Sequence, residues 1–143
     1  RLGYLTGPKE TMKWVIRLLS HSVSQATTFV QRAGVVALQG PEDDVDMMVA
    51  EFRARRDLLA AGLKSLGIPC SVPGGAFYVF PDVSGFGGGD LFTERLLKEG
   101  LIAATPGSAF GPGGRDYVRL SYATSQNRIC QALDRIEKLI ICD

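Results

Sequence analysis

The sequence predicts an α/β fold of the α+β-like kind, in which helices flank a small sheet. Segments with apolar residues at helical spacing fill residues 9–66 and the end of the chain. Short β-prone runs, punctuated by glycine and proline, lie between residues 68 and 122. A length of 143 residues and a hydrophobic content of 45% are enough to bury one core, as in an ordinary globular domain.

The first 40 residues are predicted to form one strand and two helices. Residues 1–5 favour a short strand, and they lack an initiating methionine, so we expect a chain that is truncated upstream. After a glycine-proline turn signal, apolar residues at helical spacing predict a helix that begins at Lys9. The Ser- and Thr-rich stretch 20–28 predicts an irregular segment whose hydroxyl groups cap a second helix, which ends near Leu38.

A longer helix is predicted to follow. The acidic residues 42–44 suit its first turn, because they complement the positive end of the helix dipole. Gly67 is typical of a C-terminal helix cap. The apolar stripe of this helix consists of Val45, Met48, Val49, Phe52, Leu59, Leu63 and Leu66.

Four short strands are predicted in the second half of the chain. Residues 68–72 and 76–80 are expected to pair as a hairpin through the Pro-Gly-Gly turn between them. Residues 101–104 are predicted to form another strand, which a Pro-Gly pair ends. Residues 116–122 alternate between apolar and polar side chains, which predicts a half-buried strand with Arg119 on its polar face.

Two shorter helices complete the predicted elements. The glycine cluster 85–89 predicts a surface loop, because its spacing does not match a dinucleotide-binding fingerprint. Asp90 is expected to cap a helix that runs to about Glu99. Ser125 is expected to cap the last helix, whose apolar face extends to Ile140.

Charge and cysteine content narrow the classes of function. A net charge of +1 without long runs of like charge predicts no nucleic-acid partner and no attraction to a membrane surface. Cys70, Cys130 and Cys142 are odd in number and far apart, which fits neither a disulfide framework nor closely spaced zinc ligands. We therefore expect a cytoplasmic protein without a metal site.

Few residues are candidates for chemistry. His21 is the only histidine, so neither a multi-histidine metal site nor a serine triad is expected. The five lysines fall on polar helix faces or ends, whereas a Schiff-base lysine needs a desolvated pocket that lowers its pKa. Arg119 is the residue of interest. A guanidinium group in a β-rich run forms a structural salt bridge, lies at an exposed edge, or binds a carboxylate.

Four motifs spread over nearly the whole chain carry a family resemblance. They are Arg-Leu-Gly-Tyr at residues 1–4, Gly-Ala-Phe-Tyr at 75–78, Pro-Gly-Ser-Ala-Phe-Gly at 106–111 and Arg-Leu-Ser-Tyr-Ala at 119–123. Together they resemble the C-terminal portion of the fold-type I pyridoxal-phosphate aminotransferases, the class I/II family of aspartate aminotransferase. The resemblance implies the small domain of that fold, preceded by the last strand of the large domain.

The resemblance also implies roles for individual residues. Arg119 resembles the arginine that grips the α-carboxylate of the substrate, and Arg1 resembles the arginine that pairs with the phosphate of the cofactor. Residues 22–28 resemble the loop that approaches the active site of the neighbouring subunit, and Phe77 resembles a residue near the site entrance. The family's Schiff-base lysine lies shortly before the position of Arg1 and is missing here, so no catalytic residue is named.

The full-length protein is accordingly expected to bind pyridoxal 5'-phosphate, to act on amino acids and 2-oxo acids, and to form a homodimer, whereas this chain alone is expected to be inactive. By the same resemblance, residues 1–8 are the terminal strand of the large domain, residues 9–39 are connecting helices, and residues 40–143 are the small domain.

Three alternative functions remain open. They are a lyase or decarboxylase of the same fold, a non-catalytic regulatory module, and a small domain that only dimerises or binds a partner. Aspartate, aromatic amino acids and alanine all remain open as donors.

Overall fold

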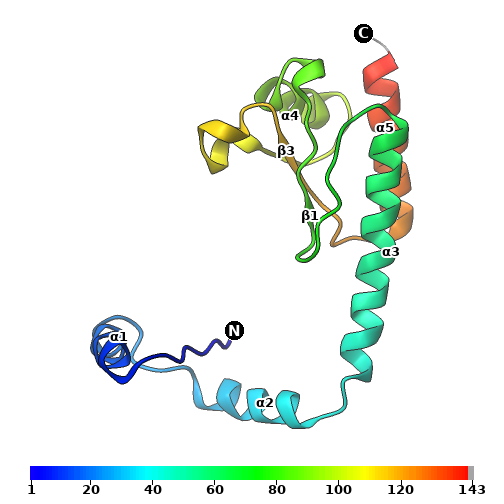
Figure 1. The fold of residues 1–143 in the computed structure, drawn as a ribbon. Helices are drawn as coiled ribbons and strands as arrows, with labels where there is room; N and C mark the ends of the chain where they lie inside the picture. Colours follow the sequence, from blue (N-terminus) through cyan, green and yellow to red (C-terminus); the bar gives the residue numbers. More distant parts are fainter. Residues whose placement is uncertain (142–143) are drawn as a thin grey trace. The chain divides into compact units, whose positions relative to one another are not determined.

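The computed structural model describes residues 1–141, so Cys142 lies outside the described residues. The chain divides into two compact units, residues 1–44 and residues 45–143 (Figure 1). Each unit is considered by itself below.

The first unit is helical. Helix α1 spans Lys9–Ser22 and helix α2 spans Thr28–Gln39, so both predicted helices are confirmed. The irregular segment between them is shorter than predicted, and Thr27 occupies the N-cap position of α2 without a side-chain hydrogen bond. The strand predicted at residues 1–5 is not formed, because a strand requires a hydrogen-bonded neighbour and no described segment pairs with these residues.

Neither α1 nor α2 contains a buried residue. The apolar side chains that predicted these helices remain accessible to solvent in the described part of the chain. Those exposed by more than 60% are Trp14, Ile16, Leu18, Phe29, Val36 and Leu38. When such side chains form a contiguous surface, that surface marks an interaction site in soluble proteins.

The second unit contains the long helix α3, which spans Asp43–Ser65. Gly67 has a φ of 73°, the left-handed conformation that glycine adopts without a Cβ clash, and it ends the helix as predicted. Its amide donates to the carbonyl of Lys64, and the amide of Ile68 donates to the carbonyl of Leu63. Leu59 and Leu63 of the predicted stripe are buried in the core.

The described residues form a sheet of three antiparallel strands in the order β1-β3-β2, of which Figure 1 labels β1 and β3. The strands are β1 (Tyr78–Val79), β2 (Thr105–Pro106) and β3 (Val118–Ser121). The central strand β3 pairs with β1 through Tyr78 and Ser121, and with β2 through Thr105 and Arg119. The predicted strand at residues 116–122 is thereby confirmed, although it is shorter.

The predicted hairpin is wrong. Residues 68–72 form no strand, and β1 pairs with β3 instead. Proline cannot donate a ladder hydrogen bond, and Pro69 lies within this run while Pro73 follows it directly. The run contacts the sheet region outside the strand ladder, for example through the bond from the Asp82 amide to the Pro69 carbonyl at 2.8 Å and through Ile68 in the core.

Two other predictions around the helix α4 (Gly89–Lys98) need correction. Residues 101–104 are not a strand, because Leu101 has a φ of 53° and the amide of Ile102 donates back to the carbonyl of Leu96. Asp90 is not the cap of α4, since the helix begins one residue earlier and Gly88 is its N-cap. Asp90 instead accepts a hydrogen bond from Ser108 Oγ at 2.6 Å.

The last helix, α5, spans Gln126–Ile141. Ser125 caps it as predicted, with its Oγ accepting a hydrogen bond from the Arg128 amide at 3.4 Å. Helices α3 and α5 lie side by side (Figure 1), and Gln126 Nε2 donates to Glu51 Oε2 at 3.2 Å. The helices and the buried face of the sheet enclose one core, which contains Leu59, Leu63, Ile68, Val79, Val83, Phe92, Leu96, Val118, Leu120, Tyr122, Ile129, Ile136 and Leu139.

Candidate functional site

The central strand of the sheet positions Arg119. Along β3, Val118 and Leu120 are buried in the core, whereas Arg119 is half-buried on the opposite face. Arg119 lies directly opposite Thr105 of β2, so these two side chains share one face of the sheet. Because β3 is the middle strand, Arg119 does not lie at a sheet edge, and that alternative for this residue is wrong.

Three side chains contact the guanidinium group of Arg119. Its Nη2 atom donates a hydrogen bond to Thr105 Oγ1 at 3.3 Å. Its Cζ atom lies 4.3 Å from the ring centroid of Tyr78 and 4.7 Å from the ring centroid of Phe110, which are cation–π distances. Both neighbouring strands therefore contribute to the site, Tyr78 from β1 and Thr105 from β2.

Within residues 1–141, Arg119 forms no ion pair with an acidic side chain. The salt bridges found in this range belong to Arg55, Arg56, Arg95 and Lys98. The structural salt bridge that the sequence left open is thus wrong for the described part of the chain. A guanidinium group has five N–H donors and Thr105 accepts one, so donors remain for a planar carboxylate.

Phe110 belongs to a rigid turn, the 3₁₀ helix η2 (Gly107–Phe110). Its ring makes a T-shaped contact with Phe80, with the ring centroids 6.0 Å apart, and Phe80 stacks on Tyr117 at a centroid distance of 5.2 Å and an interplanar angle of 4°. A Cβ atom on Gly107 would lie 2.2 Å from the carbonyl oxygen of Gly114, so only glycine allows this close approach. No local sequence pattern predicts this aromatic support, because it depends on contacts between distant segments.

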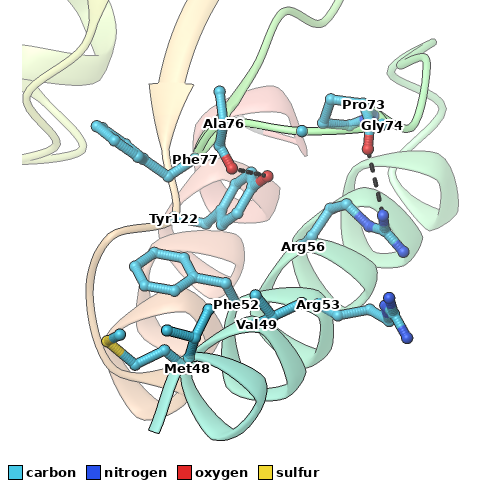
Figure 2. Close-up of a pocket in the computed structure, with 12 residues that line it drawn as sticks. Met48, Val49, Phe52, Arg53, Arg56, Pro73, Gly74, Ala76, Phe77 and Tyr122 are labelled. Carbon is cyan, nitrogen blue, oxygen red and sulfur yellow. Dashed lines mark hydrogen bonds between the residues drawn. The ribbon is translucent and has the colours of Figure 1, made fainter. Parts of the chain in front are cut away.

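A separate pocket of about 450 Å³ lies between α3 and the segment before β1 (Figure 2). It is lined mainly by apolar side chains of α3, including Met48 and Phe52, and by Tyr122, whose hydroxyl group donates to the Ala76 carbonyl at 2.9 Å. Arg119 is not among the lining residues. Phe77 lines this pocket and is 40% exposed, in ring contact with Tyr78 at 4.4 Å.

The other residues named from the sequence lie in the first unit. Arg1 is exposed in the irregular segment 1–8, and its side chain makes no hydrogen bond or ion pair with another residue of the range 1–141. Residues 22–28 are largely exposed, and Ser24 has a left-handed φ of 59°. Arg1 and Arg119 belong to different units, and each is described within its own.

All five lysines are exposed. Lys98 is paired with Glu94, and the hydrogen bond that its Nζ donates to the Glu94 carboxylate raises the pKa of Lys98 above its usual value. A lysine that forms a Schiff base requires the opposite shift, which burial produces. The lysines of this chain therefore do not suit a covalent cofactor anchor.

His21 is exposed at the end of α1. Over residues 1–141 we find no group of three or more histidine, cysteine or acidic side chains arranged for a metal ion. The same range holds no helix with both the length and the apolar character that a bilayer span requires.

Known proteins match this chain closely. The family model described as aminotransferase class I and II matches residues 1–136. An aspartate aminotransferase of Pyrococcus horikoshii is 40% identical over 144 residues, which cover 98% of this chain and 37% of that protein. An aromatic-amino-acid aminotransferase of Thermococcus litoralis is 36% identical and covers 98% of this chain and 37% of its own length.

Solved structures agree with the sequence matches. The aromatic aminotransferase from Pyrococcus horikoshii superposes with a TM-score of 0.89 at 34% identity, covering 94% of this chain and 37% of that one. The Thermus thermophilus aspartate aminotransferase with maleate superposes with a TM-score of 0.85 at 39% identity, covering 93% and 35%. The present chain spans little more than a third of the length of these relatives.

Proposed function

The chain belongs to the class I and II aminotransferase family, and on this premise we propose that it is part of an enzyme that transfers an amino group between an amino acid and a 2-oxo acid. The proposed cofactor of the whole protein is pyridoxal phosphate, which supplies an electron sink for this chemistry when bound. Within that protein, the present chain contributes the group that binds the substrate carboxylate. The observation that carries this proposal is the half-buried Arg119, which has no acidic partner among residues 1–141.

Arg119 binds the α-carboxylate through two parallel N–H···O hydrogen bonds, because the planar guanidinium fork matches the planar carboxylate. Its place on the middle strand fixes the position of the carboxylate, and this orients the rest of the substrate for reaction. A relative of known structure was solved with maleate, a dicarboxylate, which supports carboxylates as ligands.

Arg1 is assigned to the phosphate group of the cofactor. Its guanidinium group is exposed and makes no ion pair within residues 1–141, and such a group suits a phosphate. The covalent anchor has to come from a lysine outside this chain, because all five lysines here are exposed. The 143-residue chain alone is therefore inactive in this proposal.

The proposal also covers the domain organisation and the oligomeric state of the whole protein. Residues 1–8 belong to the large domain as its terminal strand, which forms only where a strand outside the described residues pairs with them; residues 9–39 connect the domains, and residues 40–143 form the small domain. The exposed apolar residues of α1 and α2 support burial against other parts of a larger assembly, which we propose is a cytoplasmic homodimer.

Assay of the whole protein that contains this segment tests the function. We expect 2-oxoglutarate to be converted to glutamate with aspartate, an aromatic amino acid or alanine as donor, and no conversion by the 143-residue chain under the same conditions. Loss of carbon dioxide or elimination from the amino acid without transfer would support the lyase or decarboxylase instead. Cofactor binding without any turnover would support the regulatory module.

A further inference from the structure

The two aromatic rings over Arg119 have a role beyond packing. We infer that Tyr78 and Phe110 are positioning residues, which hold the guanidinium plane so that its N–H edge receives the substrate carboxylate. This inference rests on the proposed function of Arg119. It is carried by the two ring distances, 4.3 Å to Tyr78 and 4.7 Å to Phe110, both measured from Cζ of Arg119.

The two contacts limit how the guanidinium group can move. Its Cζ atom lies over the ring face of Tyr78 at 4.3 Å and over that of Phe110 at 4.7 Å, while its N–H donors point outward in the guanidinium plane. Tyr78 comes from β1 and Phe110 from η2, so the two rings approach the guanidinium group from different segments. Two rings at these distances restrict the tilt of the group, and a fixed tilt favours the bidentate hydrogen bonding of a carboxylate along the N–H edge.

Thr105 restricts the rotation of the Arg119 guanidinium group. The contacts with Tyr78 and Phe110 alone still allow this planar group to rotate within its own plane. The hydrogen bond from Arg119 Nη2 to Thr105 Oγ1 at 3.3 Å restricts that turn, because Thr105 is held directly opposite Arg119 in the sheet. A free arginine side chain populates many rotamers, so this arrangement reduces the entropy lost when a substrate binds.

The rings are themselves fixed by the fold. Tyr78 is a residue of β1, paired with Ser121 of the central strand, and its ring contacts Phe77. Phe110 ends η2, and its ring is supported by Phe80. Tyr78 and Phe110, together called the aromatic clamp, are thus both held by contacts with the fold, although Phe110 is 55% exposed and contributes little to the core.

The test compares substrates that differ only in the α-carboxylate. For the whole protein loaded with cofactor, kcat/KM is measured for L-phenylalanine and phenethylamine, and for L-alanine and ethylamine, using the pair that the protein accepts; neither amine has a carboxylate. We expect Tyr78→Ala and Phe110→Ala each to lower the ratio of amino acid to amine by about tenfold. The rate with the amine should stay within about twofold, since it does not use Arg119.

Conservative variants separate positioning from general damage. Tyr78→Phe keeps the ring and should restore the ratio to within about twofold of the wild type. Phe110→Leu keeps an apolar side chain at an exposed position and should still lower the ratio, so the inference remains testable if Tyr78→Ala fails to fold. An equal fall in both rates, or an unchanged ratio, would overturn the positioning role.

Arg119→Gln distinguishes the inference from the function on which it rests. If Arg119→Gln abolishes the preference for the amino acid while the ring variants retain it, the clamp is wrong and the carboxylate role stands. If Arg119→Gln also retains the preference, the proposed function of Arg119 fails first, and the clamp fails with it.

Discussion

Replacing Arg119 with glutamine is expected to lower kcat/KM for the amino acid by about 10²- to 10⁴-fold in the whole protein. Each charge-assisted hydrogen bond is worth about 1.5–3 kcal/mol, and a bidentate carboxylate makes two of them. Their sum, about 3–6 kcal/mol, corresponds to this range because about 1.4 kcal/mol changes a binding constant tenfold. Lysine at this position should recover only part of the loss, since it has the charge but not the planar fork.

Steady-state kinetics with Arg119→Gln, Arg119→Lys and a control variant measure this effect. Arg115→Gln is the matched control, because Arg115 is an exposed arginine in the same unit whose side chain makes no hydrogen bond or ion pair within residues 1–141. It should retain activity within about twofold. If Arg119→Gln were as active as Arg115→Gln, Arg119 would not be the carboxylate-binding residue.

The substitution Leu96→Ala is expected to lower the free energy of unfolding of the second unit by about 2–5 kcal/mol. Leu96 has an exposed fraction of 0% and belongs to the core that supports the sheet, so its truncation leaves a cavity. The neighbouring Leu97→Ala is the control, because Leu97 lies in the same helix with an exposed fraction of 57%. It should change the free energy of unfolding by less than about 0.5 kcal/mol.

Urea denaturation of the 143-residue chain, followed by circular dichroism, checks both variants. The midpoint for Leu96→Ala should fall well below that of Leu97→Ala at a similar slope. Equal midpoints for the two variants would mean that α4 does not pack as described.

The helices were predictable because their signals are local. The stripe and glycine cap of α3, and the serine cap of α5, each depend on residues within one element. The strands were harder to predict, because a strand forms only where a neighbouring strand pairs with it through backbone hydrogen bonds. Residues 68–72 have β-prone side chains but are interrupted by proline, and residues 101–104 turn back to α4 through Leu101.

The candidate site was predictable only where its signal is local to one element. Arg119 could be found because an arginine stands out in an alternating strand, and the sequence left three alternatives for it. The strand order and the ion pairs of residues 1–141 excluded two of them. The contacts with Tyr78 and Phe110 join segments far apart in the sequence, so no local pattern indicated them. The role of Arg1 stays a prediction.

In the proposed function, this chain supplies the carboxylate-binding arginine of an aminotransferase but not the lysine that holds the cofactor. The most direct test is to mix the purified 143-residue chain with pyridoxal phosphate, reduce with borohydride, and determine the intact mass and the modified residue. We expect no stoichiometric adduct, because all five lysines are exposed and none has the buried setting that favours a Schiff base. A single stoichiometric adduct on one lysine would contradict the account, and both the division of roles and the assignment of Arg1 would then be wrong.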